Sequence, residues 1–252
     1  MDWMALQRRW DAQQETYLPD REQRFAAMLD VVEALTRPSP RILDLAGGTG
    51  SISRRVLERF PTARMVVVDI DAALLRIARG TFDGDERVRV VSADLETPQW
   101  VEAVGEPAGS FDAVLTATAL HWLTGARVCG VYREAGDLLR DGGILVNADH
   151  MPDPGLPTVT AGLSAYHDEQ SVLRQALPGS EDWKQWWAAL REIPELAEAV
   201  AVRDQRFAHR DSAHTELDEP SSWHVDALLR AGFAEAGLVW RSGNDAAVLG
   251  SR

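Results

Sequence analysis

Short apolar runs alternate along the chain with stretches of helical periodicity. The apolar run that begins at residue 41 ends on Asp44, a glycine-rich turn follows at 46–50, and an amphipathic helix then begins. Its apolar face carries Ile52, Val56 and Phe60, and its other face carries arginine and glutamate. Glycines let the backbone turn sharply and approach a ligand closely, and a helix start offers unpaired N–H donors. The pattern therefore predicts a strand, a turn and a helix that form a nucleotide-type binding site.

Four further apolar runs, at residues 65–71, 88–91, 111–117 and 142–147, predict the other strands of a core. The first of them contains Asp69 near its end, and Asp94 follows the second. Each run adjoins a helical pattern, and this alternation is typical of a parallel sheet with helices on both faces.

The remaining segments predict additions to this core. Residues 1–37 have the pattern of helices, and the proline-rich stretch 151–157 ends the core pattern. Helices are then expected at 159–177, at 182–193 and after Pro194, followed by a polar loop at 208–220. Ser221 and Ser222 are expected to cap a further helix, and residues 238–249 to form a hairpin. We therefore expect a core of residues 1–150 and 221–252 with a helical insertion at 151–220 that is the candidate substrate cap.

Composition excludes several classes of function. The chain has 252 residues, 45% of them hydrophobic, which supports a packed core. Its formal net charge of −13 argues against a nucleic-acid partner and against binding to anionic lipid. Cys129 is the single cysteine, so we expect neither a disulfide framework nor a thiolate zinc site. No apolar stretch is long enough to span a bilayer, and the expectation is a soluble cytoplasmic protein.

The glycine turn fits one nucleotide family better than another. A dinucleotide fingerprint requires a third small residue for close helix packing, and Ser53 stands there. Asp44, Gly48 and Gly50 instead match the D-x-G-x-G-x-G motif, with Ala46 in place of its first glycine. Together with the acidic strand ends, this order of motifs resembles class I S-adenosylmethionine-dependent methyltransferases that act on small molecules. The resemblance implies a Rossmann-like α/β fold, a mostly parallel seven-stranded sheet with an antiparallel last strand, and S-adenosylhomocysteine as product.

The resemblance also implies roles for residues at the strand ends. Asp44, Ala46, Gly47, Gly48 and Gly50 are expected around the methionine portion of the cofactor. Asp69 is expected to accept from the ribose hydroxyls and Ile70 to lie on the adenine face. Asp94 and Leu95 are expected at the adenine edge, and Thr116 at the transfer site. Tyr17 belongs to the N-terminal helices, which often fold over the cofactor in this family.

On the acceptor side, His121 follows the fourth strand at the expected active edge. It is either a general base or a side chain that only hydrogen-bonds the cofactor or the backbone. Trp122 and His150 are expected near the acceptor. Trp187, with Trp183 and Trp186, lines either an acceptor pocket or the insertion's own core, and a helical aromatic stripe favours the core.

Other functions stay open at the level of sequence. An NAD(P)-dependent oxidoreductase or a non-catalytic S-adenosylmethionine-binding protein would use the same turn. His209 and His214 flank Asp211, but their spacing places no third ligand, so we expect no metal site. The sequence carries no signal for an oligomeric state, and it does not distinguish oxygen, nitrogen and carbon acceptors.

Overall fold

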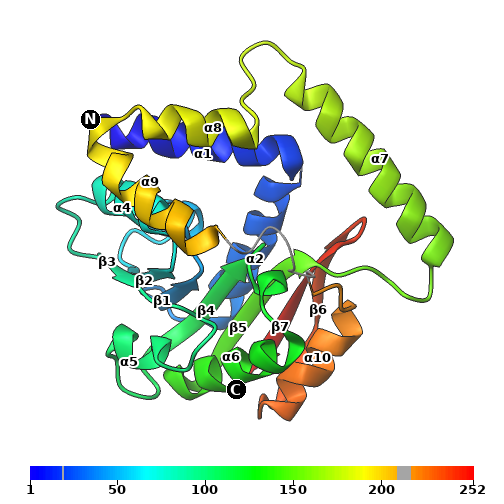
Figure 1. Ribbon diagram of the computed structural model, residues 1–252. Helices are drawn as coiled ribbons and strands as arrows, with labels where there is room; N and C mark the ends of the chain where they lie inside the picture. The colour runs from blue at the N-terminus through cyan, green and yellow to red at the C-terminus, as the bar shows by residue number, and fades with distance from the viewer. Residues whose placement is uncertain (19, 209–216) are drawn as a thin grey trace.

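The computed structural model describes residues 1–18, 20–208 and 217–252, and its centre is a seven-stranded sheet (Figure 1). The strand order is β3-β2-β1-β4-β5-β7-β6; β7 is antiparallel to both neighbours and the other pairs are parallel. The strands are β1 (Arg41–Leu45), β2 (Arg64–Asp69), β3 (Val88–Ser92), β4 (Phe111–Ala117), β5 (Leu139–His150), β6 (Glu235–Ser242) and β7 (Asp245–Ser251). The expected sheet with an antiparallel last strand is confirmed.

Helices connect the strands and continue beyond the sheet. Those of the described residues are α1 (Trp3–Tyr17), α2 (Arg21–Leu35), α3 (Ser51–Arg59), α4 (Ala72–Thr81), α5 (Trp100–Val104), the 3-10 helix η1 (Leu120–Trp122), α6 (Gly125–Leu138), α7 (Pro157–Gln175), α8 (Trp183–Arg191), α9 (Pro194–Phe207) and α10 (Ser221–Arg230). The three helices expected in the insertion are thus α7, α8 and α9; the ends of α7 and α8 lie within two residues of those predicted, and α9 begins at Pro194.

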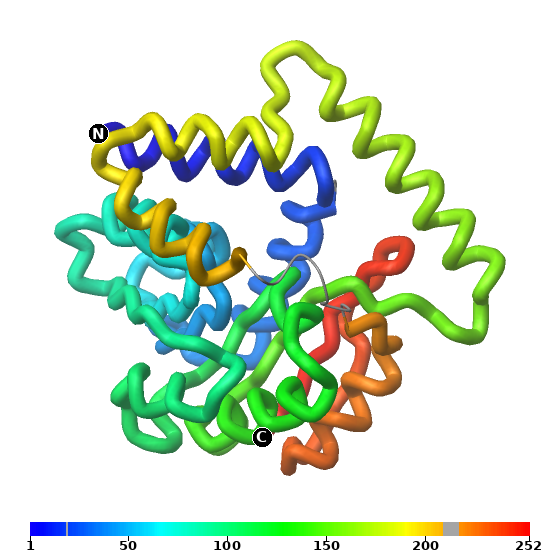
Figure 2. The backbone as a smooth tube through the Cα atoms, viewed as in Figure 1, coloured from blue at the N-terminus to red at the C-terminus, as the bar shows by residue number. Residues whose placement is uncertain are grey.

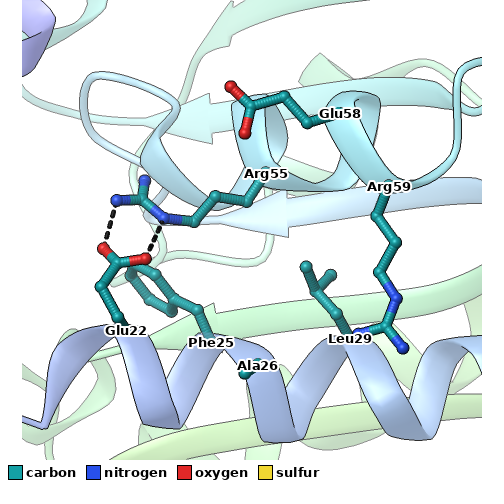
Figure 3. A pocket seen from close by; sticks show the side chains of 7 residues that line it. All are labelled: Glu22, Phe25, Ala26, Leu29, Arg55, Glu58 and Arg59. Atoms are coloured by element: carbon teal, nitrogen blue, oxygen red, sulfur yellow. Dashed lines mark hydrogen bonds and ion pairs between the residues drawn. The ribbon is translucent and has the colours of Figure 1, made fainter.

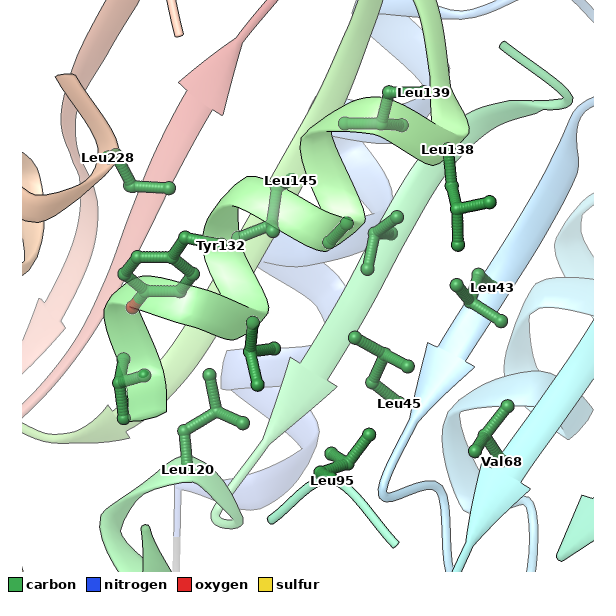
Figure 4. Packing of buried hydrophobic residues seen from close by; sticks show 14 of the residues in the cluster. Leu43, Leu45, Val68, Leu95, Leu120, Tyr132, Leu138, Leu139, Leu145 and Leu228 are labelled. Atoms are coloured by element: carbon green, nitrogen blue, oxygen red, sulfur yellow. The ribbon is translucent and has the colours of Figure 1, made fainter. Parts of the chain in front are cut away.

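Each face of the sheet is covered by its own apolar cluster, because alternate residues of a strand point to opposite faces. Leu43 and Leu145 lie on the face that α6 covers (Figure 4), in a cluster that also contains Leu228 of α10. Ile42 and Ile144, one position earlier in their strands, lie in a second cluster with side chains of α2 and α3. The strand runs are apolar without alternation because both faces are covered.

A third apolar cluster joins the insertion to the N-terminal helix. Trp10 of α1 packs against Trp186 of α8, with ring centroids 5.6 Å apart. The two helices run alongside one another in Figure 2, where α9 approaches α4. Leu74 of α4 and Val200 of α9 complete the cluster. Four helices thus form a layer beside the ends of β1, β2 and β3.

The long helix α7 projects away from this body (Figure 1). Its residues are all described, and none of them is buried. Arg174 donates to the carbonyl of Thr16, and Asn244 of the β6–β7 turn donates to the carbonyl of Thr160 and to Ser164. No described helix is long and apolar enough to cross a membrane.

One local prediction was wrong. Ser221 is the first residue of α10 and Pro220 precedes it as the N-cap, without a side-chain capping bond. Proline at the cap fixes the entry of the chain in an extended conformation, so the serines fall inside the first turn.

Candidate functional site

The turn between β1 and α3 adopts a conformation that few side chains allow. Ala46, Gly48 and Gly50 have φ of 53°, 55° and 81°, in the left-handed region that glycine adopts without steric cost. A Cβ on Gly47 would lie 2.7 Å from the Asp44 carboxyl carbon. The glycines therefore keep the backbone close to Asp44.

Two buried carboxylates, those of Asp44 and Asp69, accept hydrogen bonds from this turn and from the start of α3. The Ser53 N–H and hydroxyl both donate to Asp44 Oδ2, at 3.2 and 2.6 Å. Asp69 accepts the Gly48 N–H on Oδ2 and the Asp71 N–H on Oδ1, each at 2.8 Å. Burial raises the pKa of Asp44 to about 7 and that of Asp69 to about 6, although these hydrogen bonds lower both. Asp44 Oδ1 has no hydrogen-bond partner among the described residues.

The same edge of the sheet continues with the residues after β2 and β3. Ile70 is half-buried directly after β2. Asp94 follows β3 and accepts the Glu96 N–H at 2.9 Å, while Leu95 is buried in the α6 face cluster. Because neighbouring parallel strands end at one edge, the predicted cofactor residues of β1, β2 and β3 lie in one row.

On the other side of β1, β4 and β5 bring together a second group. Thr116 is fully buried in β4. His121 lies in η1, and its Nδ1 is 2.7 Å from Asp149 Oδ1 at the end of β5. Trp122 is 42% exposed, with its ring centroid 5.1 Å from that of His121. The strand order thus places a histidine–carboxylate pair beside the glycine turn. No pattern in the sequence pointed to Asp149 as the partner of His121.

His150, the last residue of β5, lies beside this pair. Its Nδ1 is 3.2 Å from Asp245 Oδ1, and its Nε2 is 3.7 Å from Asp218. The hydrogen bond with Asp245 raises the pKa of His150 above its usual value. His150 is half-exposed, so its charge remains in contact with solvent.

Comparison with known proteins identifies this arrangement. The methyltransferase-domain family model matches residues 42–143, from β1 into β5. The trans-aconitate 2-methyltransferase of Streptomyces avermitilis is 33% identical over 120 residues, covering 46% of this chain and 42% of that one. The enzyme of the same name from Acidovorax sp. (strain JS42) is 30% identical over 176 residues, covering 69% and 62%. An O-methyltransferase family protein from Burkholderia thailandensis shares the fold, with a TM-score of 0.57, 20% identity and coverage of 97% and 59%.

Residues 42–143 are a methyltransferase domain, and the sheet has the fold of the class I S-adenosylmethionine-dependent methyltransferases. This match decides between the two families that the glycine turn fitted, in favour of the methyltransferases. The chain spans 42% and 62% of the length of the two relatives named above.

Helix α1 covers the glycine turn through a buried polar network. Asp11 accepts from the Ser51 hydroxyl at 2.7 Å and from Arg21 Nη1 at 2.8 Å. Gln7 donates to the same hydroxyl at 3.0 Å. Sequence reasoning missed this network, because its members lie on separate elements and share no pattern.

Helix α9 is tied to the cofactor side of the site by two arginines. Arg203 Nε lies 2.9 Å from Asp71 Oδ2, and that carboxylate also caps α4 by accepting the N–H groups of Ala73 and Leu74. One turn later, Arg206 pairs with Asp94. The sequence signal for these contacts was only an i, i+3 arginine pair on a predicted helix.

The other predicted aromatic residues lie in or near the helical layer. Tyr17 accepts the Trp183 N–H on its hydroxyl at 3.0 Å, so it joins α1 to α8. Trp187 is 3% exposed, and the Arg203 guanidinium lies 3.6 Å from its ring centroid. Trp187 therefore packs within the apolar cluster near the end of β2, and its contact with an acceptor stays a prediction.

A surface hollow of about 390 Å³ between α2 and α3 is lined by Phe25, Leu29 and ion-paired side chains (Figure 3). Arg55 and Glu22 bridge it through a hydrogen bond of 2.8 Å. The hollow contains no strand-end residue, so it is separate from the site.

No group of three or more potential metal ligands occurs in the described part of the chain. His209, His214 and Asp211 lie outside the described residues.

Proposed function

We propose that this protein transfers the methyl group of S-adenosylmethionine to a small-molecule acceptor. The observation that carries the proposal is the row of strand-end residues: a left-handed glycine turn flanked by Asp44 and Asp69, with His121 in η1 directly after the adjacent strand β4. The match to the methyltransferase-domain family supports it. The net charge of −13 favours a small acceptor over a nucleic acid.

The residues around the turn fit the methionine portion of the cofactor. Asp44 Oδ1 is a buried acceptor without a partner among the described residues, and such an atom suits an ammonium group. Gly47 and Gly48 leave room where a Cβ would meet Asp44 or approach Leu74. A positively charged ligand is also favoured beside two carboxylates.

The adenosine portion belongs on β2 and β3. Each oxygen of Asp69 accepts one backbone N–H, which leaves lone pairs for the two ribose hydroxyls. Ile70 would contact the adenine face, with Asp94 and Leu95 at its edge. Tyr17 would hold α1 in place above the cofactor.

Bound S-adenosylmethionine supplies a methyl group on a positively charged sulfur that leaves readily. The work of the protein is therefore to align the acceptor and to exclude water. Thr116, His121, Trp122 and His150 surround the end of β4 and β5, where the acceptor would lie. We assign His121 as the general base that takes the acceptor's proton.

We further propose that residues 151–220 form a cap over the acceptor and the cofactor. The ion pairs from Arg203 to Asp71 and from Arg206 to Asp94 support this role, because they join the insertion to the cofactor row.

Titration calorimetry with S-adenosylhomocysteine and with NADH tests the binding site. We expect binding of the first and none of the second. Replacement of Asp69 by asparagine removes a charged acceptor, worth about 1.5–3 kcal/mol, so the S-adenosylhomocysteine affinity should fall roughly 10- to 100-fold.

Asp30→Asn is the matched control, since its exposed carboxylate lies far from the turn and pairs only with Arg59 among the described residues. It should leave the affinity unchanged. Binding of NADH alone, or of neither compound, would refute the proposal. Labelled S-adenosylmethionine incubated with the small-molecule fraction of a cell extract then tests transfer, and binding without transfer would mean a non-catalytic protein.

A further inference from the structure

Asp149 and His121 meet across the ends of two neighbouring strands. We propose that Asp149 is a positioning residue that holds His121 as the general base, and that the acceptor therefore presents a hydroxyl group. This inference rests on the proposed function and deepens it, because it names the chemical class of the acceptor.

The contact between the two residues has two points. Asp149 Oδ1 lies 2.7 Å from His121 Nδ1, and Oδ2 accepts the backbone N–H of His121 at 3.2 Å. One carboxylate thus fixes both the ring and the chain that carries it. The His150 N–H also donates to Oδ1, at 3.0 Å. These bonds leave the carboxylate little freedom to rotate.

The carboxylate of Asp149 is ionised although it is only 2% exposed. Burial raises its pKa, but the hydrogen bond and charge of His121, the His150 N–H and the charge of Arg24 outweigh burial, and the pKa lies below its usual value. An ionised carboxylate only accepts hydrogen bonds, so Nδ1 of His121 carries the proton of that contact. When His121 is in its neutral form, the proton stays on Nδ1 beside Asp149 and the lone pair is on Nε2, as a base requires.

The backbone just before His121 forms a strained turn that is hydrogen-bonded to β5. Thr118 has φ of 51°, which is rare for a β-branched residue. Its N–H donates to the carbonyl of Ala148 at 2.9 Å, immediately before Asp149. Strain of this kind is retained where the surrounding structure fixes a functional position.

A hydroxyl acceptor needs such a pair, because its proton must be removed as the oxygen is methylated. In the step, the acceptor O–H bond breaks and its proton moves to Nε2. The oxygen electron pair forms the bond to the methyl carbon, while the carbon–sulfur pair returns to sulfur and leaves neutral S-adenosylhomocysteine. A carboxylic acid has a pKa near 4 and is already ionised at neutral pH, so it needs no base. A second anion beside the buried Asp149 carboxylate would also be repelled.

The test combines a tautomer measurement with a product analysis on the full chain. Nitrogen-15 NMR should show His121 with its proton on Nδ1 in the wild type, and Asp149→Asn should change this tautomer without altering S-adenosylhomocysteine affinity. With labelled S-adenosylmethionine and a small-molecule extract, the methylated product should be stable to mild alkali, as an ether is. Asp149→Asn should lower the transfer rate at least about 100-fold.

Asp112→Asn is the matched control. Asp112 is equally buried and lies at the opposite end of the sheet, near the start of β4, where it forms ion pairs with Arg37 and Arg140. Its replacement should leave the rate per folded molecule unchanged. An Nε2–H tautomer, an alkali-labile methyl ester, or an unchanged rate in Asp149→Asn would overturn the inference. Bound S-adenosylhomocysteine without any transfer would overturn it too, whereas failure to bind S-adenosylhomocysteine would overturn the proposed function itself.

Discussion

At the scale of single residues, Ala46 is an alanine in a position that suits glycine. Its φ of 53° places Cβ close to the following carbonyl, which costs about 1–2 kcal/mol for an L-residue. The structure explains why the motif that this chain resembles has glycine here. In this chain Ala46 keeps the left-handed conformation of that glycine, and the steric strain falls on its Cβ.

Ala46→Gly should therefore stabilise the protein. We expect the free energy of unfolding to rise by roughly 0.5–1 kcal/mol, because relief of strain exceeds the extra entropy of the unfolded chain. Urea unfolding measures the change.

The same replacement at Ala188, an exposed residue inside α8, serves as control and should cost about 1 kcal/mol. A loss of stability in Ala46→Gly would show that the turn is not strained at this residue.

At the scale of elements, α9 is held to the core by side chains from its polar face. Arg203 contributes twice, through its ion pair with Asp71 and through its position over the ring of Trp187. Both partners are buried, so the guanidinium lies between a carboxylate and an indole with little competing water. The packing of α9 against the core thus depends strongly on the side chain of Arg203.

Arg203→Gln should loosen α8 and α9 without unfolding the sheet. Loss of one partner from a buried ion pair costs about 3 kcal/mol, and amide hydrogen exchange should accelerate in these two helices.

Arg191→Gln provides the comparison, because Arg191 forms an exposed pair with Asp204 in the same layer. Its effect should stay within about 0.5 kcal/mol. Equal exchange in the two variants would contradict the role assigned to Arg203.

At the scale of the whole molecule, acidic side chains gather at the carboxyl edge of the sheet. Asp44 and Asp69 have raised pKa values of about 7 and about 6, chiefly because they are buried. A carboxyl group whose pKa is raised by folding binds more protons when folded than when unfolded. It therefore favours the folded state at low pH, and this contribution is lost as the pH rises through the folded pKa.

Unfolding measured between pH 5 and pH 8 should show this loss. One pKa unit corresponds to about 1.4 kcal/mol, so Asp44→Asn should reduce the fall in stability over this range by about 2 kcal/mol.

Asp112→Asn should leave the fall unchanged, since folding lowers the pKa of Asp112 and its contribution changes only at more acidic pH. An unaltered slope in Asp44→Asn would show that Asp44 ionises normally.

The elements and the cofactor row could be predicted from the sequence alone. Apolar runs between helical patterns predicted the strands, and Asp44, Asp69 and Asp94 were recognisable because each closely precedes or follows the end of a run. The insertion helices were predictable for the same reason, since periodicity is a local property of the chain.

Contacts between residues of different elements could not be predicted, because they depend on how the elements pack in three dimensions. Asp149 is 28 positions from His121, and Arg203 is 132 positions from Asp71; neither pair has a local signal. Strand order brings β4 beside β5, and packing of α9 on α4 brings the arginine to its carboxylate. The tryptophans of α8 joined the apolar cluster because α1 and α4 offered them a surface to pack against, and the helix itself does not specify that surface.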